Sequence, residues 1–350
     1  MSRPAPVRAS ACLAHPRRGR PWLAALLLFA TIPSAWAKPN AAARVAATNA
    51  ALVAAIDKDP RDSRWRYIVI HHTAGVHDSL KAINHWHGKR FDDPLGIQYH
   101  FLIGNGGSAP DGAIQVGRWQ YRAQSIHVVH PDRAPTAITV SLQGVLHLKA
   151  PSPAQMVATE SLIRRLMAVY GIPADRVTTN TRVDGTFTLC PGKYFPFDRL
   201  AYRLRTKTSV TLADWQDPLA PVPLDGPAPD LDAVRAGLRW DRPCEEPIAI
   251  GQFQLLQVLD DRRTGAQARL LGLDGGRGCA PIERKLLAVR ATNGWYSLEL
   301  NGYRSSKLRW LGDAGDSLLQ VADEQGPILT CTVPAAAVPT CGPVRPGRRR

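Results

Sequence analysis

Five prolines within fourteen residues constrain this chain more than any other feature of its sequence. They stand at positions 218, 221, 223, 227 and 229 of the segment DPLAPVPLDGPAPD, residues 217–230. Proline fixes φ and removes a backbone donor, so this segment is predicted to be a stiff, extended spacer rather than a helix or a central strand. We therefore place a linker over residues 206–230, between a first domain at residues 63–205 and a second domain at residues 231–350.

The first 37 residues are predicted to be a secretory signal peptide. Three arginines, at positions 17, 18 and 20, precede an apolar run over residues 22–32 that is too short to span a bilayer as a helix. The sequence AWA at residues 35–37 then has the small-x-small pattern of a signal peptidase site. An N-terminal membrane anchor is the alternative. We expect a periplasmic or secreted protein of the bacterial cell envelope, without a transmembrane segment in the mature chain.

The chain is strongly basic, which favours anionic partners. It has 44 Lys and Arg against 29 Asp and Glu, a formal net charge of +15. The predicted signal holds five arginines and no acid, which leaves +10 (15 − 5) on the mature chain. Such a charge suits cell-wall polymers or phospholipid head groups. Nucleic acid is not expected, because the chain lacks an interleaved aromatic and basic motif and is predicted to be exported.

Cysteine usage agrees with export. Cys244, Cys279, Cys331 and Cys341 lie in the last third of the chain and could form two disulfides in an oxidising compartment, with three possible pairings. Cys190 stands alone in the middle of the chain. Its thiol either has a chemical role or is an inert buried side chain.

The first domain is predicted to have a mixed central sheet flanked by helices. Strands are expected at residues 67–70, 98–103, 113–116 and 138–142, with a helix at residues 79–86. A separate N-terminal helical segment at residues 38–62, between the signal and this domain, is expected to form a helix over residues 41–56. The strongest helix signal starts with Ser152 as N-cap, continues with Pro153 and a capping-box Gln155, and ends before Gly171. All nine histidines of the mature chain lie at or before His147, so chemistry is expected in this domain.

The second domain is predicted to be small and all-β. Its short apolar runs cover residues 248–259, 286–289, 295–300, 318–321 and 328–333, separated by Gly, Asp and Asn. Trp295, Tyr296 and Trp310 could stack on sugars, but core positions are the favoured interpretation. The basic tail at residues 345–350 is expected to be solvated.

Two short motifs could carry chemistry. The first motif is IHHTA at residues 70–74, in which His71 directly follows a predicted buried strand, at the sheet edge where ligands bind in open sheets. The second motif is TLCPG at residues 188–192, a predicted turn that contains Cys190. The two motifs resemble those of the zinc-dependent N-acetylmuramoyl-L-alanine amidases, the type 2 amidase family that includes the lysozyme of phage T7 and the animal peptidoglycan recognition proteins. The resemblance extends to residues 65–75 (WRYIVIHHTAG), 95–106 (LGIQYHFLIGNG), 125–144 (SIHVVHPDRAPTAITVSLQG) and 151–155 (PSPAQ).

The resemblance implies a zinc site that hydrolyses peptidoglycan. His71 and Cys190 match metal ligands of the family, and His72 should point to the opposite face of the strand. Zinc-assisted attack of water would split the amide bond between N-acetylmuramic acid and the L-alanine of the stem peptide. Tyr99 and Thr188 match catalytic positions, and His127 matches a substrate-side or structural histidine. By contrast, His85, His87 and His130 are expected on the surface or in turns.

One position departs from the family pattern. The third ligand is a histidine ten residues before the ligand Cys, and Asn180 stands there. An amide oxygen is a poor donor for Zn²⁺, which prefers nitrogen and sulfur. Asn180 could bind weakly, Asp184 or another nearby group could substitute, or the site could be empty. We predict zinc-dependent amide hydrolysis, with a catalytically weak or silent peptidoglycan- or muropeptide-binding protein as the alternative.

Overall fold

The computed structural model describes residues 40–58, 64–75, 78–127, 134–183, 188, 190–223, 253–273, 284–291, 294–301, 307–311, 316–323, 326–334 and 337–344. The predictions made for residues 1–37, for His130, Asp184, Cys244 and Cys279, and for the basic tail lie outside these residues.

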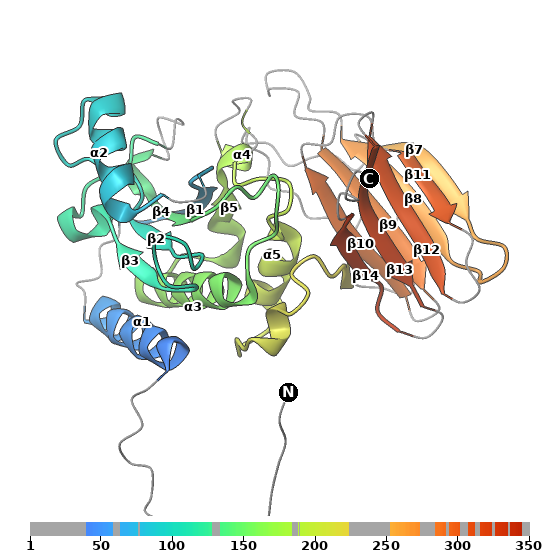
Figure 1. Ribbon diagram of the computed structural model, residues 1–350, viewed down its shortest axis with the longest axis horizontal. Coiled ribbons are helices and arrows are strands. Elements are labelled where there is room, and N and C mark those ends of the chain that lie inside the picture. The colour runs from blue at the N-terminus through green and yellow to red at the C-terminus, as the bar shows by residue number, and fades with distance from the viewer. Residues whose placement is uncertain are drawn as a thin grey trace, which may run out of the picture. The chain divides into compact units, whose positions relative to one another are not determined.

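The first domain is built on a five-stranded mixed sheet (Figure 1), as predicted. Its strand order is β3-β2-β4-β1-β5. Strands β1, β2, β4 and β5 are parallel, and β3 pairs antiparallel with β2 through the predicted hairpin. The strands are β1 (Tyr67–His72), β2 (Phe101–Ile103), β3 (Ile114–Val116), β4 (Ala137–Leu142) and β5 (Val177–Thr179). The expected strand over residues 98–103 is shorter than predicted, because only its last three residues pair within the sheet.

Five α-helices accompany this sheet in the described part of the first domain. They are α1 (Ala41–Asp57), α2 (Leu80–Phe91), α3 (Pro153–Tyr170), α4 (Asn180–Val183) and α5 (Phe197–Thr206). Four short 3₁₀ segments connect them: η1 (Arg118–Tyr121), η2 (Ala134–Thr136), η3 (Ala174–Arg176) and η4 (Ala213–Trp215).

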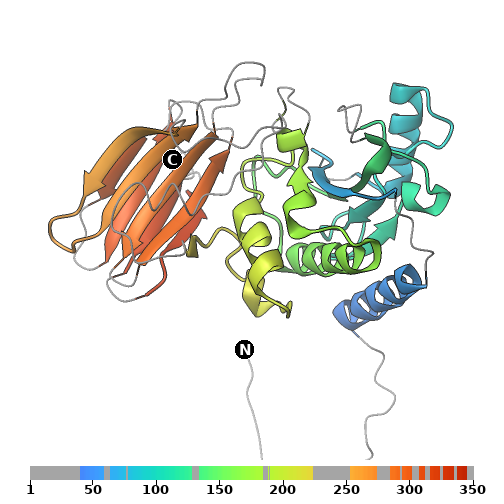
Figure 2. The ribbon, with the colours of Figure 1, turned by 180° about the vertical axis from the view of Figure 1, so that it is seen from behind.

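The predicted start and end of helix α3 are confirmed. The Ser152 side chain accepts a hydrogen bond from the backbone of Gln155, whose side chain in turn accepts from the Ser152 backbone, and Gly171 ends the helix in the left-handed conformation. These local contacts satisfy backbone groups that a helix end leaves unpaired. The apolar face of α3 packs with Ile68, Ile70 and Val140 of the sheet in one core cluster, so the helix covers one face of the sheet (Figures 1 and 2).

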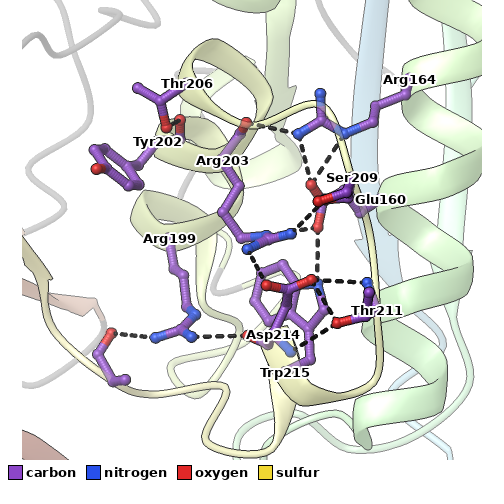
Figure 3. Close-up of polar contacts among 11 residues, drawn as sticks. Glu160, Arg164, Arg199, Tyr202, Arg203, Thr206, Ser209, Thr211, Asp214 and Trp215 are labelled. Atoms are coloured by element: carbon purple, nitrogen blue, oxygen red, sulfur yellow. Dashed lines mark hydrogen bonds and ion pairs between the residues drawn. The ribbon is translucent and has the colours of Figure 1, made fainter.

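A buried carboxylate joins α3 to α5 and η4 (Figure 3). Glu160 is fully buried and accepts hydrogen bonds from Arg164 at 2.6 Å, from Arg203 at 2.8 Å and from the indole of Trp215 at 2.8 Å. Arg203 also forms an ion pair with Asp214 at 2.9 Å. Trp215 is therefore part of the core of this domain, although it lies in the segment predicted as a linker, residues 206–230. The proline-rich stretch begins only at position 218, three residues after Trp215.

The C-terminal part has two antiparallel sheets, which confirms an all-β region. Their strand orders are β6-β10-β9-β8-β7 and β11-β12-β13-β14, and residues of both sheets share one apolar core cluster (Figure 2). The strands are β6 (Val222–Pro223), β7 (Phe253–Asp260), β8 (Gln267–Leu273), β9 (Arg284–Ala291), β10 (Gly294–Asn301), β11 (Lys307–Leu311), β12 (Ser317–Asp323), β13 (Gly326–Val333) and β14 (Thr340–Pro343).

Two side-chain predictions for this region can be compared with the structure. Cys331 and Cys341 form a disulfide between paired positions of β13 and β14. Trp295 and Tyr296 are buried, and Trp310 packs against the same core, as the core interpretation of these aromatics predicted. None of the helices in the described residues is long and apolar enough to span a bilayer.

Candidate active site

The carboxyl end of β1 places His71 at the centre of the candidate site. The strand is apolar and fully buried over residues 68–70, as expected of a central strand, and its next residue, His71, is equally buried. Ile70 lies opposite Thr179 of the neighbouring parallel strand β5. Asn180 follows Thr179 as His71 follows Ile70, so the two residues are neighbours at this edge of the sheet.

Cys190 reaches the same edge from a turn far away in the sequence. Its Sγ lies 3.7 Å from Nδ1 of His71 and 3.4 Å from the backbone nitrogen of His72, which donates to it. The backbone N–H of Thr181 donates to the carbonyl oxygen of Cys190 at 2.9 Å, which ties the turn to α4. Gly192 has a φ of +111°, and a Cβ there would lie 2.6 Å from the backbone of Leu146, so the turn requires glycine at this position.

His72 points away from His71, as strand alternation predicts. Its Nδ1 accepts a hydrogen bond from the backbone of Leu146 at 3.2 Å, and its ring centroid lies 4.9 Å from that of His147. Burial lowers the pKa of His72 to about 4. His72 is therefore a neutral, structural residue that holds the loop after β4.

Tyr99 packs against His71. Its ring centroid is 5.5 Å from that of His71, the residue is buried, and its hydroxyl donates to the carbonyl oxygen of His72 at 3.4 Å. Burial, followed by the nearby Cys190, raises the pKa of Tyr99 above its usual value. The phenol is therefore protonated at neutral pH and can donate a hydrogen bond inside the site.

His127 and His87 complete a cluster of rings around His71 and Tyr99. The His127 centroid lies 5.0 Å from that of His71, 5.3 Å from that of Tyr99 and 5.6 Å from that of His87. The prediction of a surface or turn position is wrong for His87, which is buried on α2 and accepts a hydrogen bond from the backbone of Gln98 at 3.1 Å. Exposed His85 agrees with that prediction. No local sequence pattern marks His87 as buried, because its burial depends on the loop that approaches α2.

The histidines of this cluster are neutral at pH 7. Burial, and then the neighbouring histidines, lower the pKa of His71 well below its ordinary value. Burial lowers the pKa of His127 to about 4. The pKa of His87 is also lowered to about 4, by burial first and then by the neighbouring His127 and Arg118. A neutral imidazole has one free lone pair, which is the form that binds metal ions.

Thr188 lies beside the backbone of Cys190, in the turn that the sequence identified. Its Oγ1 accepts a hydrogen bond from the backbone N–H of Cys190 at 3.2 Å. Because the hydroxyl oxygen serves as the acceptor in this contact, the hydroxyl proton is available to a group bound in the site.

The arrangement of His71 and Cys190 fits one metal ion. A tetrahedral Zn²⁺ with Zn–N of about 2.1 Å and Zn–S of about 2.3 Å holds the two donors about 3.6 Å apart. The observed separation of Nδ1 and Sγ is 3.7 Å. Two protein donors are therefore positioned for zinc before any metal binds.

The third donor is the point at which the site differs from a complete ligand set. Among the described residues, no three His, Cys, Asp or Glu side chains converge closely enough to hold a metal ion. Asn180 is buried, and its Oδ1 has no hydrogen-bond partner within the described part of the chain. A buried amide oxygen without a partner could accept a cation, although zinc prefers nitrogen and sulfur.

Part of the chain matches a known family model. Residues 61–193 match the family model described as N-acetylmuramoyl-L-alanine amidase. The chain is similar in structure to the N-acetylmuramoyl-L-alanine amidase LysC from Clostridium intestinale, with 29% identity and a TM-score of 0.35, over 43% of this chain and 92% of that chain.

Two further solved structures belong to animal proteins. Bumblebee PGRP-SA is 23% identical with a TM-score of 0.31, over 37% of this chain and 77% of that chain. Human PGRP-IBETAC in complex with glycosamyl muramyl pentapeptide is 24% identical with a TM-score of 0.32, over 37% of this chain and 79% of that chain. A comparison with curated proteins finds no match.

Proposed function

We propose that this protein hydrolyses the amide bond between N-acetylmuramic acid and the L-alanine of the peptidoglycan stem peptide, because residues 61–193 match the family model described as N-acetylmuramoyl-L-alanine amidase. The observation that carries the proposal is the contact of 3.7 Å between His71 Nδ1 and Cys190 Sγ beside the buried hydroxyl of Tyr99. This contact brings together the motifs at residues 70–74 and 188–192, which are more than a hundred residues apart in the sequence.

His71 and Cys190 are the proposed zinc ligands, with Asn180 at the third ligand position of the family. A bound Zn²⁺ would polarise the lactyl carbonyl and lower the pKa of the attacking water. The backbone N–H of His72 donates to the Cys190 sulfur, and a thiolate is the form of cysteine that binds metal.

Tyr99 and Thr188 are proposed to stabilise the charge that develops on the carbonyl oxygen. The Tyr99 phenol stays protonated, because burial raises its pKa, and its ring packs 5.5 Å from that of His71. The Thr188 hydroxyl keeps its proton available while its oxygen accepts from Cys190. One such preorganised donor is worth about 10²–10³ in kcat.

Peptidoglycan or its soluble muropeptides are the proposed substrate. The positive charge of the chain suits the anionic polymers of a cell wall. The predicted signal peptide would export the protein to the periplasm or out of the cell, where such a substrate is found.

The experiment is digestion of purified muropeptides, with the full chain supplied with Zn²⁺ or with a chelator. We expect release of free stem peptide with Zn²⁺ and its loss with chelator, measured by mass spectrometry. The C190A variant is the matched control, because it removes one proposed ligand from a partly buried turn. Absence of stem peptide in every condition would reject the proposal.

Asn180 favours a second function, peptidoglycan binding without hydrolysis. The imidazole expected at this position is missing, and the described residues do not hold a complete set of three His, Cys, Asp or Glu ligands. A binding protein would need no metal. Sedimentation with insoluble peptidoglycan that is unchanged by chelator, together with absent hydrolysis, is the result that this alternative predicts.

A further inference from the structure

We propose that Trp86 of α2 is a stacking platform for a sugar of the glycan strand, beside the candidate active site. This inference rests on the proposed function and names the residue that binds the glycan side of its substrate. Trp86 is 57% exposed, and it is the only exposed tryptophan among the described residues. The other tryptophans in that part of the chain are buried or pack against a core.

Two rings of the same helix hold the indole of Trp86 in place. Its ring centroid lies 5.1 Å from that of His87, and it lies 6.5 Å from that of Phe91 with an angle of 80° between the ring planes. The rings of His87 and Phe91 also contact each other, at 5.5 Å. Tilted and edge-to-face contacts of this kind favour one ring orientation. The indole is therefore preorganised, while more than half of the residue's surface stays exposed.

The two supporting rings connect Trp86 to the candidate active site. The ring centroids of His87 and Phe91 lie 5.6 Å and 5.7 Å from that of His127. His127 in turn lies 5.0 Å from His71. A single exposed apolar side chain is ordinary on a protein surface, whereas an exposed ring that continues a site indicates a binding surface. Trp86 is the outermost ring of an aromatic wall that begins at His71.

The chemistry of the proposed substrate brings sugars to this wall. The scissile amide is carried by the lactyl group of N-acetylmuramic acid, so a pyranose ring begins only a few bonds from the carbonyl carbon. The next sugars of the strand extend away from the scissile bond and reach the outer part of the wall. A pyranose has an apolar face of C–H groups, and a rigid, exposed indole can bury such a face.

The stem peptide is the competing ligand for this surface. Lys89 and Arg90 are exposed and follow Trp86 at the spacing that places residues on one face of a helix, so their charges suit the carboxylates of a peptide. By contrast, the rings that connect Trp86 to the site are uncharged at pH 7, because burial lowers the pKa of His87 and of His127 to about 4. An uncharged aromatic wall suits a neutral sugar, so glycan is the ligand proposed for Trp86.

The test measures binding and turnover by the full chain. Calorimetry gives Kd for two probes: the peptide-free tetrasaccharide of alternating N-acetylglucosamine and N-acetylmuramic acid, and the free stem peptide. Turnover is compared between the same tetrasaccharide carrying stem peptides and a single N-acetylmuramoyl peptide. The variants are W86A and W86F, with Y121A as the matched control at a tyrosine of η1 that is 50% exposed. Circular dichroism checks that each variant is folded.

We expect W86A to weaken tetrasaccharide binding about 10-fold or more, as for loss of an aromatic anchor, and W86F to weaken it less. The affinity of W86A for stem peptide and that of Y121A for both probes should stay at the wild-type value. In W86A, KM for the tetrasaccharide substrate should rise by a similar factor with kcat unchanged, because uniform binding is lost. The single-sugar substrate is too short to reach Trp86, so its KM should not change.

Three results overturn the inference: unchanged tetrasaccharide affinity in W86A, loss of stem-peptide affinity in its place, or no tetrasaccharide binding by the wild type. Release of stem peptide by the wild type in any of these cases leaves the proposed function standing. Conversely, tetrasaccharide binding that depends on Trp86, without release of stem peptide, supports the inference and rejects hydrolysis.

Discussion

The Nδ1 atom of His71 lies 3.7 Å from the Sγ atom of Cys190, although 119 positions separate the two residues. The sheet and the glycine-containing turn create this contact together. β1 ends at the carboxyl edge, and the turn at Cys190 is held there by Thr181 and by the close approach of Gly192 to Leu146. The contact is the part of the site on which the proposed chemistry depends.

Replacing Cys190 should separate metal binding from folding. C190A removes the sulfur donor, and we expect at least a 100-fold loss of Zn²⁺ affinity and loss of stem-peptide release, because a ligand is lost rather than a neighbour of a ligand. C190D keeps an anionic donor and should retain weaker binding. Zinc content after dialysis is the measurement, and an unchanged stoichiometry in C190A would contradict the assignment.

Removing the Tyr99 hydroxyl should lower turnover but not metal content. Y99F keeps the ring that packs against His71 and His127 and loses the donor. We expect kcat to fall about 10²-fold with KM nearly unchanged, as for loss of one preorganised donor. If kcat for stem-peptide release is within about twofold of wild type while zinc content is normal, Tyr99 has no catalytic role.

The hydroxyl of Thr188 should contribute in the same direction. T188V removes both the donor and the acceptor for the backbone of Cys190, and we expect kcat to fall about tenfold or more. T188S keeps the hydroxyl and is the control, with activity close to wild type. Equal activity of the valine and serine variants would show that the hydroxyl is not used.

Local signals in the sequence were sufficient for the elements that depend on local contacts. The N-cap, proline and capping box of α3 lie within four residues of each other, so its boundaries could be predicted. β5 has only three residues and forms by pairing with β1, so no local sequence pattern predicts this strand. Strands β8, β11 and β14 were missed in the same way.

The candidate site was predictable only in part. His71, Tyr99 and Cys190 could be named because their motifs resemble those of a known family, and the structure brings all three together. The burial of His87 and the approach of His127 to His71 depend on how α2 and the segment before β4 pack, which the sequence pattern does not encode.

The carboxylate of Glu160 should be important for stability. E160Q keeps its shape but removes the charge that Arg203 and Arg164 surround in the core (Figure 3), and breaking such a buried network costs about 3–5 kcal/mol. The control is D57N, which disrupts the partly exposed ion pair with Arg165 and should cost about 1 kcal/mol or less. Urea denaturation gives both free energies of unfolding, and similar values for the two variants would contradict this role.

Acid should destabilise the first domain through His100, a buried residue that is not part of the site. The backbone N–H of Thr139 donates to its Nδ1 at 2.9 Å, so Nε2 carries the proton and donates to the carbonyl of Ala123 at 3.0 Å. Burial lowers the pKa of His100 from 6.5 to about 3. Between these values the unfolded chain binds the proton and the folded protein does not, so the free energy of unfolding falls as the pH decreases from 6.5.

The variant H100N isolates this contribution. Unfolding in urea is measured with chelator present, so that metal binding does not affect the pH dependence. Between pH 6 and pH 4, we expect the slope of the unfolding free energy to be lower in H100N than in wild type by about 1.4 kcal/mol per pH unit, the value for one proton. H100N should also be less stable at pH 7, because the contacts with Thr139 and Ala123 are weakened. H85Q, at an exposed histidine, should keep the wild-type slope, and an equal slope in H100N and wild type would mean that His100 does not resist protonation in the folded state.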